Sequence, residues 1–74
     1  MTNREILKNR LNYRESKNKY IMEDFIENKI SEEDIQIALS FLNDNGNHHK
    51  IANISYSENG NLNIKLETGI TFLK

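Results

Sequence analysis

The fold is decided by residues 52–72, which have the sequence ANISYSENGNLNIKLETGITF. Apolar residues occupy alternate positions before Asn59-Gly60, after it, and again after Gly69. This period of two is typical of strands that bury one face. The stretch therefore predicts antiparallel strands joined by tight turns.

The length of the first turn follows from the need to keep all apolar side chains on one face. A two-residue turn at Asn59-Gly60 would place Ile64 opposite Ser55 and put the apolar sets on opposite faces. A three-residue turn at 58–60 avoids this and gives Gly60 the left-handed position of a type I turn with a bulge. The expected pairs are Tyr56 with Leu62, Ile54 with Ile64, and Ala52 with Leu66.

The second turn follows the same rule. A three-residue turn at 67–69 pairs Leu66 with Ile70 and Ile64 with Phe72, which keeps one buried face. The alternative is one long strand over 61–74 with Gly69 inside it. We favour the three-stranded meander because a glycine in a strand interior weakens the strand.

Residues 1–30 are expected to form a helical arm that begins at a capping box, Thr2 to Glu5. Two apolar sets follow at helical spacing, Leu7 with Leu11, and then Ile21, Met22, Phe25 and Ile26. One continuous helix would place Arg14 on the same face as these apolar residues, where burial of its charge is costly. Either the helix breaks near 14–18, or one end of a long helix protrudes from the core.

Residues 31–43 predict a second helical segment. Ser31 is an N-cap followed by three acidic residues, which the helix dipole favours in a first turn. Apolar positions at helical spacing follow, and Gly46 is suited to end the helix. These are Ile35, Ala38, Leu39 and Leu42, with Ile37 and Phe41 widening the apolar face.

The expected fold class is therefore α+β, with two or three N-terminal helices packed on a small antiparallel meander of two to three strands. Seventy-four residues form one domain, 1–74, with the arm at 1–30, the helix at 31–43 and the meander at 50–74.

Composition narrows the classes of function. The chain contains no cysteine, and no apolar run approaches the length of a membrane span or a signal sequence. We therefore expect a cytoplasmic protein without membrane contact. The abundance of Asn, Ile and Lys indicates an AT-rich genome, and chains of this size are common on mobile genetic elements such as phages and plasmids.

No motif for catalysis or cofactor binding is present. His48-His49 is a pair of adjacent residues, whereas zinc sites need three or four protein ligands. The serines lack a nucleophile elbow, and the three glycines are too scattered for a phosphate loop. We therefore expect no metal, no cofactor, no small-molecule substrate and no enzymatic activity.

Charge is unevenly distributed, because residues 1–19 carry a formal charge of +4 and residues 20–44 carry −6. On a helix, three basic residues would align beside two leucines, as in an amphipathic helix that engages a groove. This pattern predicts a partner-binding helix face, made of Leu7, Arg10, Leu11, Arg14 and Lys17.

The leading hypothesis is a small protein-binding module that acts through its first helix or its sheet, of the type of regulator or inhibitor of a host protein that phages and plasmids encode. An exposed edge strand at 70–74 is a further place where a partner strand could pair. The partner of this module is another protein or a second copy, since the basic arm of one copy complements the acidic middle of another. Arg10→Glu with Arg14→Glu should then abolish binding without changing the circular dichroism spectrum or melting temperature.

The alternative is a small DNA-binding regulator, similar to a winged helix, that uses the same basic arm. In that architecture the helix at 31–43 would enter the major groove by its N-terminal end, which carries Glu32-Glu33-Asp34. Carboxylates there would face phosphates and base edges, so nucleic acid is the less favoured partner.

Overall fold

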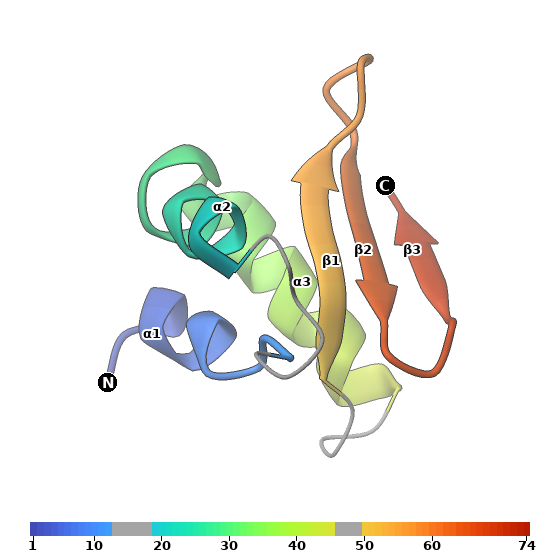
Figure 1. Cartoon of the computed structure of the whole chain (residues 1–74), viewed down its shortest axis with the longest axis horizontal. Coiled ribbons are helices and arrows are strands. Elements are labelled where there is room, and N and C mark those ends of the chain that lie inside the picture. The colour runs from blue at the N-terminus through green and yellow to red at the C-terminus, as the bar shows by residue number, and fades with distance from the viewer. Residues whose placement is uncertain (13–18, 46–49) are drawn as a thin grey trace.

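A computed structural model describes residues 1–12, 19–45 and 50–74 of the chain. In the described residues, helices precede a three-stranded antiparallel sheet, and Figure 1 shows the helices together on one side of it, with α3 passing behind β1. The α+β architecture expected from the sequence is confirmed. The elements are α1 (Asn3–Lys8), α2 (Lys19–Asp24), the π-helix η1 (Phe25–Lys29), α3 (Glu32–Asp44), β1 (Ile51–Tyr56), β2 (Leu62–Leu66) and β3 (Thr71–Leu73).

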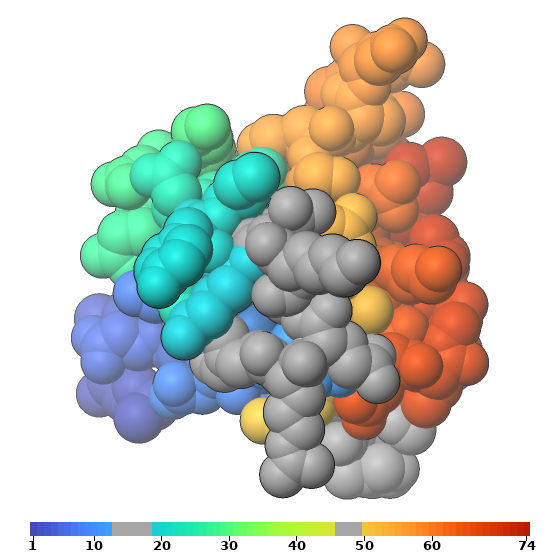
Figure 2. Space-filling view, viewed as in Figure 1, coloured from blue at the N-terminus to red at the C-terminus, as the bar shows by residue number. Residues whose placement is uncertain are grey.

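The sheet is the expected meander, in the order β1-β2-β3. Both turns contain a glycine in the left-handed region, Gly60 at φ 80° and Gly69 at φ 94°. Strand β2 ends at Leu66 before the second turn, so the alternative of one long strand is wrong. The turn between β1 and β2 stands clear of the body of the molecule (Figure 2).

The register confirms three of the expected pairs, and a hydrogen bond from the Leu66 amide to the Ile70 carbonyl at 2.9 Å agrees with a fourth. Tyr56 lies opposite Leu62, Ile54 opposite Ile64, and Ile64 opposite Phe72. The expected pair of Ala52 with Leu66 is wrong, because an irregularity between Ile51 and Asn53 places Ile51 opposite Leu66. The extra residue lets the larger Ile51 side chain become completely buried while Ala52 stays partly exposed.

The N-terminal arm is not one continuous helix. Thr2 accepts a hydrogen bond from the Glu5 amide, as the capping box predicts, but α1 ends at Lys8. Leu11 then forms a parallel bridge with Ile51, in which the Ile51 amide donates to the Arg10 carbonyl at 2.7 Å. The chain thus leaves the helix before Arg14 would reach the apolar face. The predicted break at 14–18 lies outside the described residues.

Helix α3 begins as predicted, with the Ser31 hydroxyl accepting from the Asp34 amide at 3.1 Å. It ends at Asp44 with Asn45 as its C-cap, and the predicted role of Gly46 falls outside the described residues. Its buried positions are Ile35, Ala38 and Leu42.

The core lies between the helices and the sheet and contains only apolar side chains among the described residues. In addition to Ile35, Ala38 and Leu42 of α3, the core contains Leu7, Leu11, Met22, Phe25, Ile26, Ile30, Ile51, Ile54, Leu62, Ile64 and Leu66. Among the described residues, no helix has the length and apolar character needed to cross a membrane.

Candidate protein-binding surface

The five residues predicted to bind a partner do not form one surface. Leu7 and Leu11 lie in the core, with exposed fractions of 0% and 1%. Arg10 lies in the turn after α1 and not on a helix, while Arg14 and Lys17 lie outside the described residues. The leucines therefore have a packing role, and partner binding by the three basic residues stays a prediction.

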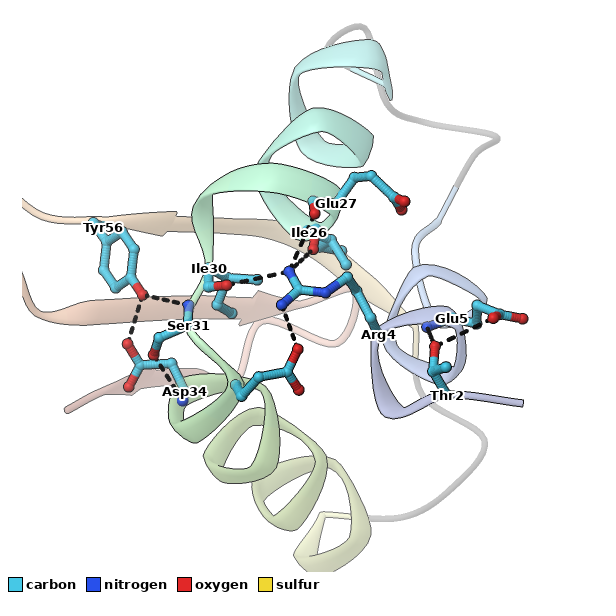
Figure 3. A network of polar contacts seen from close by, with 10 residues as sticks. Thr2, Arg4, Glu5, Ile26, Glu27, Ile30, Ser31, Asp34 and Tyr56 are labelled. Carbon is cyan, nitrogen blue, oxygen red and sulfur yellow. Dashed lines mark hydrogen bonds and ion pairs between the residues drawn. The ribbon is translucent and has the colours of Figure 1, made fainter.

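Arg4 joins α1 to η1 and to the N-terminal end of α3, as Figure 3 shows. One guanidinium nitrogen donates to the carbonyl oxygens of Ile26 (2.7 Å), Glu27 (3.3 Å) and Ile30 (3.2 Å). The other donates to the Glu32 carboxylate at 2.5 Å. Carbonyls at a helix end lack partners within the helix, so Arg4 satisfies groups that η1 leaves unpaired.

A second pair of charges connects the same elements, because the Lys8 ammonium lies 2.9 Å from the Glu27 carboxylate. Together with the Arg4–Glu32 contact, this pair links the basic N-terminal segment to the acidic middle within one chain. The charge asymmetry therefore has an intramolecular role.

The N-terminal turn of α3 is held to the sheet by a second polar cluster. The Tyr56 hydroxyl donates to Asp34 at 2.6 Å and accepts from the Ser31 amide at 3.3 Å (Figure 3). The Lys74 ammonium contacts the other Asp34 oxygen at 3.1 Å. The Tyr56 hydrogen bond, supported by Lys74 and Ser31, holds the pKa of Asp34 below its ordinary value. This end of α3 is thus engaged in the fold, unlike the free end of a DNA-recognition helix.

On the other flank of α3, a groove of about 420 Å³ runs between this helix and β3. Its apolar floor is formed by three partly buried side chains, Ile37, Phe41 and Phe72. The Phe41 and Phe72 rings stack at a centroid distance of 4.9 Å with an interplanar angle of 30°. The remaining lining residues are Glu33, Gln36, Ser40 and Asp44.

The groove adjoins an open strand edge. Strand β3 is last in the sheet and pairs on one side with β2, and no other described strand pairs with it. Ile70 and Leu73 at this edge are 41% and 61% exposed. An apolar groove beside unpaired strand backbone is a surface that a partner chain can extend.

The charge of this groove is negative. Of its lining residues, Glu33 and Asp44 are the charged ones, and both are exposed. Neither carboxylate takes part in an ion pair or side-chain hydrogen bond among the described residues. The groove thus combines an apolar floor with an acidic rim.

Potential metal ligands lie apart from one another in the described part of the chain. No group of three or more potential ligands among the described residues is placed to hold a metal ion. The His48-His49 pair falls in 46–49, outside the described residues. Comparisons with models of known protein families, with curated proteins and with solved structures found no match.

Part of this surface was signalled in the sequence. Ile37 and Phe41 widen the apolar face of α3 past the positions that are buried in the core. A helix face of this width can contact a second apolar surface. Phe72 continues the period-two pattern into the last strand. The sequence also indicates an edge strand at 70–74 that could pair with a partner strand, but it does not indicate the groove between this strand and α3.

Proposed function

We propose that this chain is a small, non-enzymatic protein-binding module, and that its principal binding surface is the groove between α3 and β3. The observation that supports this is the apolar floor of the groove, which adjoins an unpaired strand edge. This floor is open to solvent, whereas the core side chains of the described residues are buried. Apolar surface that is rimmed by polar groups is characteristic of contact sites between proteins.

The mode of action that fits such a module is occupation of a surface on a larger protein. A domain of this size has little room for an enclosed substrate pocket, whereas an open groove accepts a segment of another chain. We propose that the chain regulates or inhibits its partner in this way. Such a role suits a protein of a mobile genetic element that acts on its host.

The test is site-specific photo-crosslinking in an extract of the native host. A benzophenone amino acid replaces Gln36, which lines the groove, or Glu58, which lies in the exposed turn between β1 and β2. We expect one protein to be crosslinked at Gln36 and not at Glu58, and mass spectrometry identifies it. Equal products from both positions, or none, would contradict the proposal.

A pair of variants shows whether the groove is needed. Ser40→Arg places a long side chain in the groove, whereas Asn43→Arg adds the same charge to α3 outside the groove. Both positions are exposed, so the core is unaffected. We expect Ser40→Arg to abolish crosslinking at Gln36 and Asn43→Arg to preserve it.

The basic N-terminal residues are tested in the same assay. If Arg10→Glu with Arg14→Glu abolishes crosslinking while Ser40→Arg does not, the partner binds the N-terminal segment and the groove is not the site. If nuclease treatment of the extract abolishes crosslinking, nucleic acid mediates the contact and the alternative function is favoured.

A further inference from the structure

We propose that the partner segment binds as an additional strand on β3, in an extended conformation, with apolar side chains at alternate positions on the face towards α3 and basic side chains at both ends of that face. This inference rests on the proposed function and specifies the chemistry of the partner. Addition of a strand to an open sheet edge obtains affinity from main-chain hydrogen bonds and specificity from alternate side chains.

The hydrogen-bond pattern defines which backbone groups of β3 are available. The Leu66 amide donates to the Ile70 carbonyl at 2.9 Å, and the Lys74 amide donates to the Leu62 carbonyl at 3.0 Å. Backbone groups of successive residues in a strand point to opposite sides. Residues 70, 72 and 74 therefore face β2, whereas the amide and carbonyl groups of Thr71 and Leu73 face the open edge.

The same register places the groove beneath any added strand. Phe72 lies opposite Ile64, which is completely buried, so Phe72 is on the helix-facing side of the sheet. A new strand beside β3 continues this face, and every second side chain points towards α3. There it meets Ile37 and Phe41, the exposed part of the groove floor, so apolar side chains at those positions become buried.

The acidic rim selects the charge of the partner. Glu33 and Asp44 lie at opposite ends of α3, and the groove lining contains no basic residue. Lysine and arginine have long apolar stems, so they cover the edge of the groove while their charged groups reach these carboxylates. A partner with acidic residues in the same places would be repelled.

A second copy of the chain fits less well. Symmetric pairing through β3 would place Phe72 against its own counterpart and would supply Lys74 as the charged side chain of the strand. The Lys74 ammonium is already paired with Asp34 in its own chain. The acidic groove thus finds no complementary charge in a second β3, and the structure favours a different, basic partner.

The charge requirement is tested with two fluorescent synthetic peptides in which threonine occupies every second position. The positions between, which face α3, are valine in the centre, and at both ends they are lysine in one peptide and glutamate in the other. Fluorescence anisotropy measures their affinity for the full chain at low salt. We expect the lysine peptide to bind at least about tenfold more tightly, and Glu33→Lys with Asp44→Lys to reverse the preference. An unchanged preference in this variant would overturn the proposal.

The variant is suited to this test because its two changes have opposite effects on the helix. Lysine at 33 opposes the dipole in the first turn of α3, whereas lysine at 44 favours it in the last turn. The matched control is Glu23→Lys with Glu58→Lys, which makes the same change in net charge away from the groove. We expect the control to retain the preference for the lysine peptide.

The backbone requirement is tested separately. Leu73→Pro removes an amide that faces the open edge, where proline is tolerated, and should lower the affinity for the lysine peptide at least about tenfold. If this variant melts at a lower temperature, N-methylation of the peptide at alternate residues tests the same bonds with the native protein. One methylated set should prevent binding and the other preserve it, and equal effects would overturn strand addition.

Two further outcomes would overturn the inference. If the lysine peptide does not bind while crosslinking at Gln36 persists, the groove binds a protein in another manner and the proposed function stands. If sedimentation shows concentration-dependent dimers that Leu73→Pro abolishes, the occupant is a second copy. If the native chain neither binds the lysine peptide nor is crosslinked at Gln36, the proposed function itself is refuted.

Discussion

Replacement of Arg4 should destabilise the protein far more than its position near the N-terminus suggests. Its guanidinium donates to three backbone carbonyls and one carboxylate, and its side chain is 23% exposed. Hydrogen bonds that involve a charged group contribute about 1.5–3 kcal/mol each when buried. Because these bonds share one side chain and are partly solvated, we expect Arg4→Ala to lower the unfolding free energy by about 2–3 kcal/mol in total.

This is a large fraction of the stability of so small a domain, for which about 3–5 kcal/mol is usual. At about 4–8 °C per kcal/mol, the midpoint of thermal unfolding should fall by roughly 10–20 °C. Arg4→Lys should be almost as harmful, because a lysine ammonium does not reproduce the planar fork that reaches several carbonyls at once. Circular dichroism melting and urea titration measure both variants.

The matched control is Lys29→Ala, which removes a cation from an exposed ion pair with Asp24, where the two charged atoms are 3.4 Å apart. Exposed pairs contribute little, so the melting temperature should hardly change. If Arg4→Ala and Lys29→Ala melt at the same temperature as the native protein, Arg4 does not join the helices in solution and the argument from its contacts is refuted.

Three other predictions concern the fold. The depressed pKa of Asp34 means that its stabilising contribution is present above its ordinary value of 3.8 and is lost as the pH falls through its lower folded value. Tyr56→Phe removes the main cause of that shift, so urea titrations across acidic pH should show a shallower loss of stability; an unchanged slope would contradict this. Leu7→Ala should lower the unfolding free energy by about 2–5 kcal/mol, because Leu7 is fully buried. A negligible change would contradict its place in the core. Gly60→Ala should lower the unfolding free energy by about 1–2 kcal/mol, since alanine is strained at φ 80° although no atom crowds the site, and Gly60→Asn should lower it less on thermal melting.

The sheet register was predictable because two independent requirements agreed. The alternation of apolar residues and the turn glycines both select three-residue turns, and a shift by one residue would expose the whole buried face. The irregularity at Ala52 was not predictable in the same way. Ile51 and Ala52 are adjacent and both apolar, so the alternation alone does not decide which of them faces Leu66.

The end of the first helix was harder to predict for a different reason. The spacing of Leu7 and Leu11 is that of two residues on one face of a helix, yet Leu11 reaches the core from an extended segment beside Ile51. No glycine or proline marks this change. It depends on a contact with a strand forty residues away in the chain, and a local pattern carries no information about such a contact.

The open strand edge was predictable from the sequence, but the groove beside it was not, because the burial of a helix face depends on how much of that face the sheet covers. The pattern of α3 predicts that Ile37 and Phe41 are apolar neighbours of the core, which is confirmed. Only the position of the three-residue strand β3, with Phe72 against Phe41, shows that the cover is incomplete. Similarly, the sequence shows Arg4 only as part of a basic segment, and the structure adds that it pairs with Glu32 of the same chain.

The most direct test of strand addition in the groove is a nuclear magnetic resonance titration of the isotope-labelled chain with the lysine peptide. We expect the amide signals of Thr71 and Leu73 to shift and their hydrogen exchange to slow, together with shifts at Ile37 and Phe41. Signals of the turn between β1 and β2 should stay unchanged. Shifts confined to the segment around Arg10, with no protection of Thr71 and Leu73, would contradict the account.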